Sequence, residues 1–520
     1  MSEAGQARRL ARSTAIFTLA TGLSRALGLV REIVSAYFFG ATGKINAFTV
    51  ASQIPSLVRA FVGDAALSGA FVPIFSELVA KQDKARAWRV ASTIFWLVLI
   101  GVSALTALLI LLAPLLIRPF GDPGGDPELA VTLSRILMPT VGLLTVSGVI
   151  VGILNAYDHF TVPALAPVVW NVVIIGGLLV GVPLVGDEST ELILYAVVTL
   201  IATVMQLLLP VPWLRGLDGR LQAVVDWRDP AVRRFFALML PVTLTLGLIN
   251  ISIFVDMIFA SRLVDPDLAP TAIEKAFRIY MLPQGMFSVA VVTVLFPTLS
   301  RLAALGDLQG FRGTVDSGLR QIGFLLVPAS IVGAVLAEPI VRLLYERGEF
   351  TADDTVVVSQ CLVAFSLGLT FNGWMLLLSR AFYSLQRNWI PTGVALGTVA
   401  LNAALDAVFY RLGIWGIPLA TSVVNVVGVG LLLVFMRRDP GLAAPRQVVA
   451  SLFWILLASA AAGAVGLGAW AGLDALLGRE LWAQIVTLTA GLGSAALVYL
   501  GAARLLGVRE LDALRALRRR

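Results

Sequence analysis

The stretch WLVLIGVSALTALLILLAPLLI, residues 96–117, contains no charged side chain, and it decides the class of fold. An α-helix of roughly 20 apolar residues is long enough to cross the hydrocarbon core of a bilayer. Runs of this kind recur from Ile16 to Leu506, separated by short charged or Gly/Pro-rich loops. With 58% hydrophobic and only 14% charged residues among 520, the chain has too little polar surface to coat a soluble globule. The sequence predicts a membrane protein.

The apolar runs are expected to be α-helices, because backbone groups in lipid must satisfy each other within a segment. A β-barrel would instead show alternating segments of about ten residues. The predicted fold class is therefore an all-α polytopic membrane protein with about 14 transmembrane helices. The expected spans are 12–38, 46–79, 88–117, 129–155, 161–183, 190–213, 232–262, 269–301, 314–346, 355–384, 389–412, 415–436, 447–473 and 480–505.

The loops between these spans alternate in charge. Basic residues precede the first span and follow the second, sixth, eighth and twelfth, and the chain ends in three arginines. The intervening loops at 121–128, 186–191, 264–274 and 350–354 are acidic. Because cytoplasmic loops retain Lys and Arg, this alternation predicts an even number of spans with both termini in the cytoplasm.

The formal net charge of +7 would also suit a nucleic-acid-binding protein. Here the basic residues are spread over many short loops, so we interpret them as topology determinants facing anionic lipid and expect no nucleic acid partner. Cys361 is the only cysteine and His159 the only histidine, and neither a GxSxG motif nor a P-loop is present. The chain lacks the motifs that a catalytic triad or nucleotide hydrolysis requires. This predicts a gradient-driven transporter and not an enzyme.

Two sequence matches at nearly one offset indicate an internal duplication. FVPIFSEL at 71–78 resembles LFPTLSRL at 295–302, and LNAYDHFTVP at 154–163 resembles FYSLQRNWIP at 382–391. Loop composition alone would mimic either match, but not the shared offset. We therefore predict an N-lobe at 1–215 (spans 1–6), a C-lobe at 216–438 (spans 7–12), and spans 13–14 with a basic cytoplasmic tail at 439–520. Repeat transporters bind substrate at the repeat interface.

Charged side chains inside the predicted spans point to a site. An arginine at mid-bilayer costs at least about 2.5 kcal/mol on insertion scales, so it usually faces a cavity or a partner. The second span carries Arg59 with Asp64 beside it, and the eighth carries Arg278. The first span has Arg25 and Glu32 next to a polar stripe at helical spacing, which consists of Thr21, Ser24, Gly28 and Arg31.

Two interpretations of these arginines are open. If the four converge from both lobes on one central cavity, their rigid guanidinium forks match the oxygens of a phosphate or diphosphate. Alternatively, Arg31 with Glu32 and Arg59 with Asp64 are internal ion pairs that only fix packing, or Arg31 snorkels to the outer interface.

A second constellation is rich in oxygen. Asp256 lies in span 7, Asn402 and Asp406 are four residues apart on span 11, and Thr421 follows on span 12. Carboxylate, amide and hydroxyl oxygens are the ligands of a hard cation such as sodium. Alternatively, Asp256 pairs with an arginine and Asn402 only bridges helices.

Several stretches resemble one family. SRALGLVREIVSAYFFGA at 24–41, NAFTVASQIPSLVRAF at 46–61 and AFVPIFSE at 70–77 are similar to the N-terminal signature of the MurJ (MviN) lipid II flippases, in the multidrug/oligosaccharidyl-lipid/polysaccharide (MOP) exporter superfamily. LPQGMFSVAVVTVLFPTLSR at 282–301 and YERGEFTADD at 345–354 resemble its C-lobe motifs. The resemblance implies fourteen helices in two lobes, a lipid-tail groove on the last two, and a place in the bacterial cytoplasmic (inner) membrane.

The resemblance also implies roles for particular residues. The positions that match residues handling the diphosphate and sugar headgroup are Ser24, Arg25, Arg31, Arg59 and Arg278. The positions that match a sodium site of some members are Asp256, Asn402, Asp406 and Thr421, with Ile417 as a backbone ligand. Apart from sodium, no cofactor is implied.

Three positions depart from the family pattern and bear on its gating ion pairs. Asn46 stands where an Asp is usual, Ala60 where a second Arg can follow, and Phe277 where an Asp often precedes the cavity arginine. Without an Asp at 277, Arg278 is freer for ligand or depends on Asp64. The expected gating or charge partners are Glu32, Asn46 and Asp64.

Together, the residues and the resemblance predict a flippase. Its expected partners are membrane lipids and an undecaprenyl-diphosphate-linked peptidoglycan precursor, which a monomer moves from the inner to the outer leaflet by alternating access. Rival hypotheses are a related exporter of another isoprenoid-linked glycan or a drug, a non-transporting scaffold that recruits cell-wall synthesis enzymes, and, more distantly, an embedded glycan-transfer enzyme.

Overall fold

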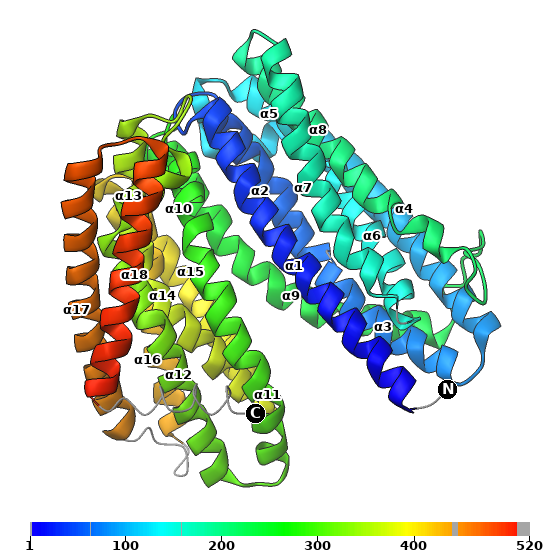
Figure 1. The fold of residues 1–520 in the computed structure, drawn as a ribbon. Coiled ribbons are helices and arrows are strands. Elements are labelled where there is room, and N and C mark those ends of the chain that lie inside the picture. The colour runs from blue at the N-terminus through cyan, green and yellow to red at the C-terminus, as the bar shows by residue number, and fades with distance from the viewer. Residues whose placement is uncertain (1–2, 63, 158, 439–445, 507–520) are drawn as a thin grey trace. The chain divides into compact units, whose positions relative to one another are not determined.

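The computed structural model describes residues 3–62, 64–157, 159–438 and 446–506, and every regular element within these ranges is helical (Figure 1). The long helices are α1 (Glu3–Phe39), α2 (Ile45–Val62), α3 (Asp64–Ala80), α4 (Lys84–Ile117), α5 (Pro127–Leu137), α6 (Pro139–Ala156), α7 (Thr161–Gly181), α8 (Glu188–Leu208), α9 (Pro230–Phe259), α10 (Ala269–Pro283), α11 (Val289–Ala304), α12 (Leu308–Val335), α13 (Ala337–Tyr345), α14 (Ala352–Ser384), α15 (Trp389–Phe409), α16 (Gly416–Arg437), α17 (Arg446–Leu477) and α18 (Leu481–Leu505). The short 3-10 and π segments are η1 (Arg118–Phe120), η2 (Pro123–Gly125), η3 (Val182–Leu184), η4 (Val211–Leu214), η5 (Ala260–Val264), η6 (Gln284–Ser288) and η7 (Tyr410–Leu412). The predicted all-α class is confirmed.

Eleven helical segments among the described residues are long and apolar enough to cross a membrane. They coincide with the predicted spans 3–6 and 8–14. The predicted spans 1, 2 and 7 coincide with α1, with α2 and α3, and with α9, which are not among the eleven. The count of fourteen spans therefore stays a prediction.

Side chains in the loops begin many of the helices. Asp126, Asp187 and Asp307 accept hydrogen bonds from the backbone N–H groups that open α5, α8 and α12. Thr351 and Asp354 form a capping box at the start of α14. The N–H of Thr190 is the main reason that the pKa of Asp187 lies below its ordinary value. Acidic loop residues thus begin several of the helices.

The chain divides into two compact units. Unit 1 comprises Met1–Arg262 with Pro266–Pro270, and unit 2 comprises Leu263–Asp265 with Thr271–Arg520. By these contacts α9 belongs to unit 1, where it packs on α2 and α3. The predicted lobes rest on sequence repeats instead of contacts, and their boundaries at 215/216 and 438/439 stay a prediction.

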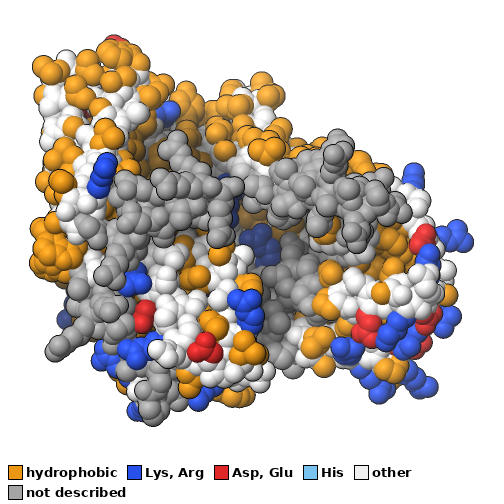
Figure 2. Space-filling model, turned by 60° about the horizontal axis from the view of Figure 1, so that its bottom comes forward, with side chains coloured by type: hydrophobic (Ala, Val, Ile, Leu, Met, Phe, Trp, Pro, Cys, Tyr) orange, Lys and Arg blue, Asp and Glu red, His pale blue; other side chains and the backbone are white. Residues whose placement is uncertain are grey.

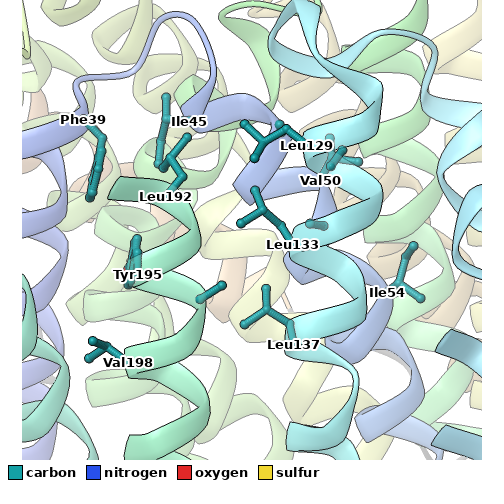
Figure 3. Close-up of a cluster of buried hydrophobic side chains, with 14 of the residues drawn as sticks. Phe39, Ile45, Val50, Ile54, Leu129, Leu133, Leu137, Leu192, Tyr195 and Val198 are labelled. Carbon is teal, nitrogen blue, oxygen red and sulfur yellow. The ribbon is translucent and has the colours of Figure 1, made fainter. Parts of the chain in front are cut away.

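The largest part of the core of unit 1 joins α1, α2, α5 and α8. In Figure 3, Leu129, Leu133 and Leu137 follow one face of α5, at the spacing of a helix turned toward a core. The ring of Tyr195 on α8 stacks on Phe39 and on Phe48, with ring centroids 5.7 and 4.2 Å apart. These aromatic contacts hold the end of α1 and the start of α2 against α8.

In unit 2, small residues bring α17 and α18 together. A Cβ on Gly466 would lie 3.0 Å from the carbonyl oxygen of Gly491, so the two backbones pass too closely for larger residues. Tyr499 of α18 donates a 2.6 Å hydrogen bond to the carbonyl oxygen of Phe324 on α12. Small residues on both helices therefore permit the close approach of α17 and α18.

Ion pairs gather near the turn between α3 and α4. Lys84 contacts Asp218 at 2.7 Å, and Glu77 contacts Lys81 and Arg234 at 2.6 and 3.1 Å. Figure 2 shows a face that carries groups of Lys and Arg side chains with carboxylates among them, and hydrophobic side chains at its borders. A face of this kind suits the polar surface of a membrane.

Arg86 and Asp229 form a bidentate ion pair. Nε and Nη2 of Arg86 each donate a 3.0 Å hydrogen bond to a different carboxylate oxygen of Asp229, which also caps α9. The Arg86 hydrogen bonds are the main reason that the pKa of Asp229 is lowered.

We predict that a double-mutant cycle with Arg86→Ala and Asp229→Asn gives a coupling of about 1 kcal/mol at pH 7, since solvent screens the half-exposed Arg86. The folded-state pKa of Asp229 lies below its unfolded value of about 3.9, so the contribution is complete above that pH and is lost as the pH falls through the folded pKa. Thermal unfolding in detergent at pH 7 and pH 3 measures this. A coupling that grows at pH 3 would contradict it.

Candidate substrate and cation sites

Arg31 lies in a contact between α1 and α7. Its Nη2 is 2.5 Å from a carboxylate oxygen of Glu32, and its guanidinium carbon is 4.7 Å from the ring centroid of Trp170. The arginine side chain is only 12% exposed. The Arg31–Glu32 ion pair, which was one of the two interpretations open from the sequence, is therefore present in the structure.

The polar stripe of α1 also faces α7. The side-chain amide of Asn171 donates to the carbonyl oxygens of Ser24 and Pro167, at 3.4 and 2.9 Å. A Cβ on Gly28 would lie 4.0 Å from Oδ1 of Asn171. Sequence reasoning missed Trp170 and Asn171, although two polar-tipped side chains within the apolar run PVVWNVVIIGG at 167–177 were the available signal.

The other predicted cavity arginines of unit 1 are more accessible. Arg25 and Arg59 are exposed, and Ser24 is partly buried. The side chain of Asp64 lies outside the described residues, so its proposed pairing with Arg59 is untested. Arg278 is in unit 2, so the convergence of the four arginines on one cavity stays a prediction.

Asn46 joins two loops of unit 1. It is fully buried, and its side-chain nitrogen lies 2.9, 3.0 and 2.6 Å from the carbonyl oxygens of Ala41, Gly43 and Asp267. The backbone N–H of Gly43 donates to the same Asp267 oxygen at 2.7 Å. Three carbonyl acceptors require a donor at this position, which an amide supplies and a carboxylate does not. The departure from Asp to Asn therefore has a physical reason in this chain.

Arg278 pairs within its own helix. Its Nη2 is 2.8 Å from a carboxylate oxygen of Glu274, one turn earlier on α10, and its side chain is 49% exposed. Glu274 was not among the predicted site residues, although it lies four residues before Arg278, the spacing at which helical side chains pair. Phe277, at the position where an Asp often stands, packs its ring 5.5 Å from that of Phe365.

Two further cations of unit 2 are buried and were not foreseen. Lys275 is 3% exposed, and its ammonium lies 5.2 Å from the ring centroid of Tyr345. Arg342 on α13 has a side chain that is 5% exposed and contacts three carboxylates. Those carboxylates belong to Glu338, Glu346 and Asp474, the last on α17. Through these contacts Arg342 links α13 to α17.

Part of the predicted sodium site lies on α15 and α16. Asp406 and Asn402 are 0% and 1% exposed, and the Asn402 amide donates to Asp406 Oδ2 at 3.2 Å. Ile417 is buried and Thr421 partly buried on α16, which packs on α15. Asp256 belongs to unit 1, so its place relative to these residues stays a prediction.

Long apolar helices with charged side chains buried among them are typical of one class of protein, the polytopic membrane transporters. A solved inward-facing multidrug resistance MATE family transporter of the MOP superfamily superposes with a TM-score of 0.64 at 16% identity, covering 84% of this chain and 94% of that one. At this identity the likeness shows the fold alone. A solved structure of lipid II flippase MurJ in an inward closed conformation superposes with a TM-score of 0.76 at 25% identity, covering 95% and 99%.

Sequence comparison gives the family. The family profile described as lipid II flippase MurJ matches residues 35–484. The probable lipid II flippase MurJ of Vibrio cholerae is 31% identical over 98% of this chain and 99% of its own length, and the lipid II flippase MurJ of Burkholderia cenocepacia is 29% identical over 88% and 89%. The chain belongs to the lipid II flippase MurJ family, which is one of transporters and not of enzymes, and it is a multi-pass membrane protein.

We predict that Asn46→Asp destabilises the protein by about 3 kcal/mol or more, because a buried carboxylate would face three carbonyl oxygens. Asn46→Ala, which removes the bonds without adding charge, should cost less. Thermal unfolding of the purified variants measures both. An Asp variant as stable as the parent chain would contradict the donor role of Asn46.

Proposed function

We propose that this chain is a lipid II flippase, which moves the undecaprenyl-diphosphate-linked peptidoglycan precursor from the inner to the outer leaflet of the cytoplasmic membrane by alternating access. The observation that carries the proposal is the family match across residues 35–484, joined to the guanidinium groups of Arg278 within that range and of Arg31 just before it. Relatives named as lipid II flippases match over nearly the whole chain, which supports the same cargo.

The arginines supply the chemistry that this cargo requires. A diphosphate presents several charged oxygens, and a guanidinium contacts two of them in one plane. Arg25 and Arg59 are exposed and Arg278 is half-exposed, so these three meet the headgroup first. Ser24 and Arg31 lie deeper against α7 and act on the diphosphate and first sugar. Glu32 and Asn46 hold the empty state closed, and Asp64 takes the charge-partner role that the sequence gives it.

The lipid tail needs an apolar path that stays in contact with the bilayer. A groove of about 450 Å³ in unit 2 runs between α12, α14 and α17. Its lining is largely aliphatic and aromatic, with polar groups only at a few positions such as Ser330 and Thr370, which hydrogen-bond to each other at 3.0 Å. The isoprenoid tail lies along this side of α17 while the headgroup crosses.

The remaining elements of the proposal concern topology and assembly. Both termini lie in the cytoplasm, as the basic loops favour. The chain acts as a monomer that delivers its product to cell-wall synthesis enzymes. It uses six predicted spans in each lobe, 1–215 and 216–438, with residues 439–520 added for the lipid tail.

We predict that Arg59→Ala and Arg278→Ala each reduce lipid II translocation at least tenfold and fail to support growth after depletion of the parent protein, because each removes a phosphate ligand. Arg220→Ala, which removes an exposed loop arginine, is the matched control and should behave as the parent. Lipid II reaching the outer leaflet, detected by an externally added lipid II-modifying enzyme, is the measurement.

The same variants separate the rival functions. If Arg59→Glu still exports a cationic drug, the chain is a drug exporter. If the two alanine variants complement depletion fully, the chain is a scaffold and the flippase proposal fails.

We further propose that sodium binds Asp406, Asn402, Thr421 and the Ile417 carbonyl oxygen, with Asp256 as a fifth ligand. The donor set on α15 and α16 fits this ion, because the buried Asp406 carboxylate lies beside the Asn402 amide and the adjacent helix carries the Thr421 hydroxyl. Bound sodium would couple the ion gradient to the change between inward and outward states.

We predict that sodium chloride raises the unfolding temperature by several degrees above equal potassium chloride, since an ion that binds only the folded state stabilises it. Asp406→Asn should abolish the difference, whereas Asp353→Asn, at an exposed carboxylate, should keep it. Equal unfolding temperatures of the parent chain in the two salts would exclude the site.

A further inference from the structure

Arg31 has an unusual environment for a substrate ligand. Among the described residues, only its Nη2 has a hydrogen-bond partner, Glu32, and its Nε is buried without one. The guanidinium lies over the Trp170 ring at 4.7 Å. A cation over an aromatic ring is attracted by the face of the ring, and this contact uses none of its N–H donors. The stacked guanidinium therefore keeps N–H donors that no described residue uses.

The Trp170 ring is itself held in place by a residue of α8. Its Nε1 donates a 3.1 Å hydrogen bond to Oγ1 of Thr203 on α8, and that hydroxyl donates to the carbonyl oxygen of Thr199 at 2.8 Å. Thr203 is 1% exposed, and the indole packs against the buried cluster around Tyr195. The ring plane is thus set by α7 and α8 together, independently of Arg31.

A fixed aromatic ring reduces the conformational freedom of the long arginine side chain that lies on it. In a free guanidinium, several rotatable bonds must be ordered when a diphosphate binds, and this ordering weakens binding. Glu32 contacts only Nη2, and this single hydrogen bond leaves the guanidinium free to turn about it. The Trp170 ring defines that plane.

We propose that Trp170, anchored by Thr203, is a positioning residue that orients Arg31 for the diphosphate of the substrate. The inference rests on the proposed function, because it assumes that Arg31 contacts the cargo. It assigns the α7–α8 pair of unit 1 a part in substrate recognition, without requiring Trp170 to touch the lipid.

The test is a binding cycle on the full chain in nanodiscs, with lipid II as the probe. Arg31→Ala and Trp170→Leu should each weaken binding about tenfold, and the double variant should bind as weakly as Arg31→Ala alone. Trp170→Phe, which keeps a ring face, should restore most of the affinity, and Thr203→Val should fall between. Trp96→Leu, at another tryptophan that donates to a carbonyl oxygen, is the matched control and should bind as the parent.

Unfolding temperatures of all variants separate positioning from stability. A purely structural Trp170 would lower the unfolding temperature and weaken binding equally in the presence and absence of Arg31, so losses that multiply would overturn the proposal. Unchanged affinity of Trp170→Leu would do the same. If Arg31→Ala binds normally, the proposal and the role of Arg31 both fail, whereas a parent chain that does not bind lipid II overturns the proposed function itself.

Discussion

A positive charge placed among apolar helices must be compensated, and this constraint organises the candidate site. Lipid offers no water to solvate a guanidinium, so each one requires a carboxylate, an aromatic face or a polar cavity. Arg31 has Glu32 and Trp170, Arg278 has Glu274, and Arg342 has three carboxylates. The partners differ in number, and the difference indicates what each arginine does.

Arg342 and Arg31 represent two ends of this range. Three carboxylates from α13, its following loop and α17 surround Arg342, so an anionic ligand would meet net negative charge there. Arg31 has one carboxylate, and its Nε has no hydrogen-bond partner among the described residues. A carrier must bind its cargo and release it, and a single exchangeable partner suits both steps better than a saturated one. Under the proposed function, Arg31 and Arg278 each exchange their carboxylate partner for the diphosphate.

Much of the fold was predictable from the sequence, because hydropathy and the need for internal backbone hydrogen bonding leave only helices at these lengths. The candidate residues were also identifiable, since charge is rare in such runs. The residues that these candidates contact were harder to predict. Glu274 follows from helical spacing, whereas Trp170, Thr203 and the carbonyl oxygens around Asn46 come from packing between segments distant in sequence. Single-sequence periodicity specifies which face of a helix is polar, but not which helix that face meets.

The central claim is that arginines within the helices hold the diphosphate of a lipid-linked precursor. A structure of this chain determined with lipid II bound tests it most directly. The account predicts that the diphosphate oxygens lie within hydrogen-bond distance of at least two guanidinium groups among Arg25, Arg31, Arg59 and Arg278, with the Arg31 group still stacked on Trp170. A diphosphate bound away from all four arginines would contradict it.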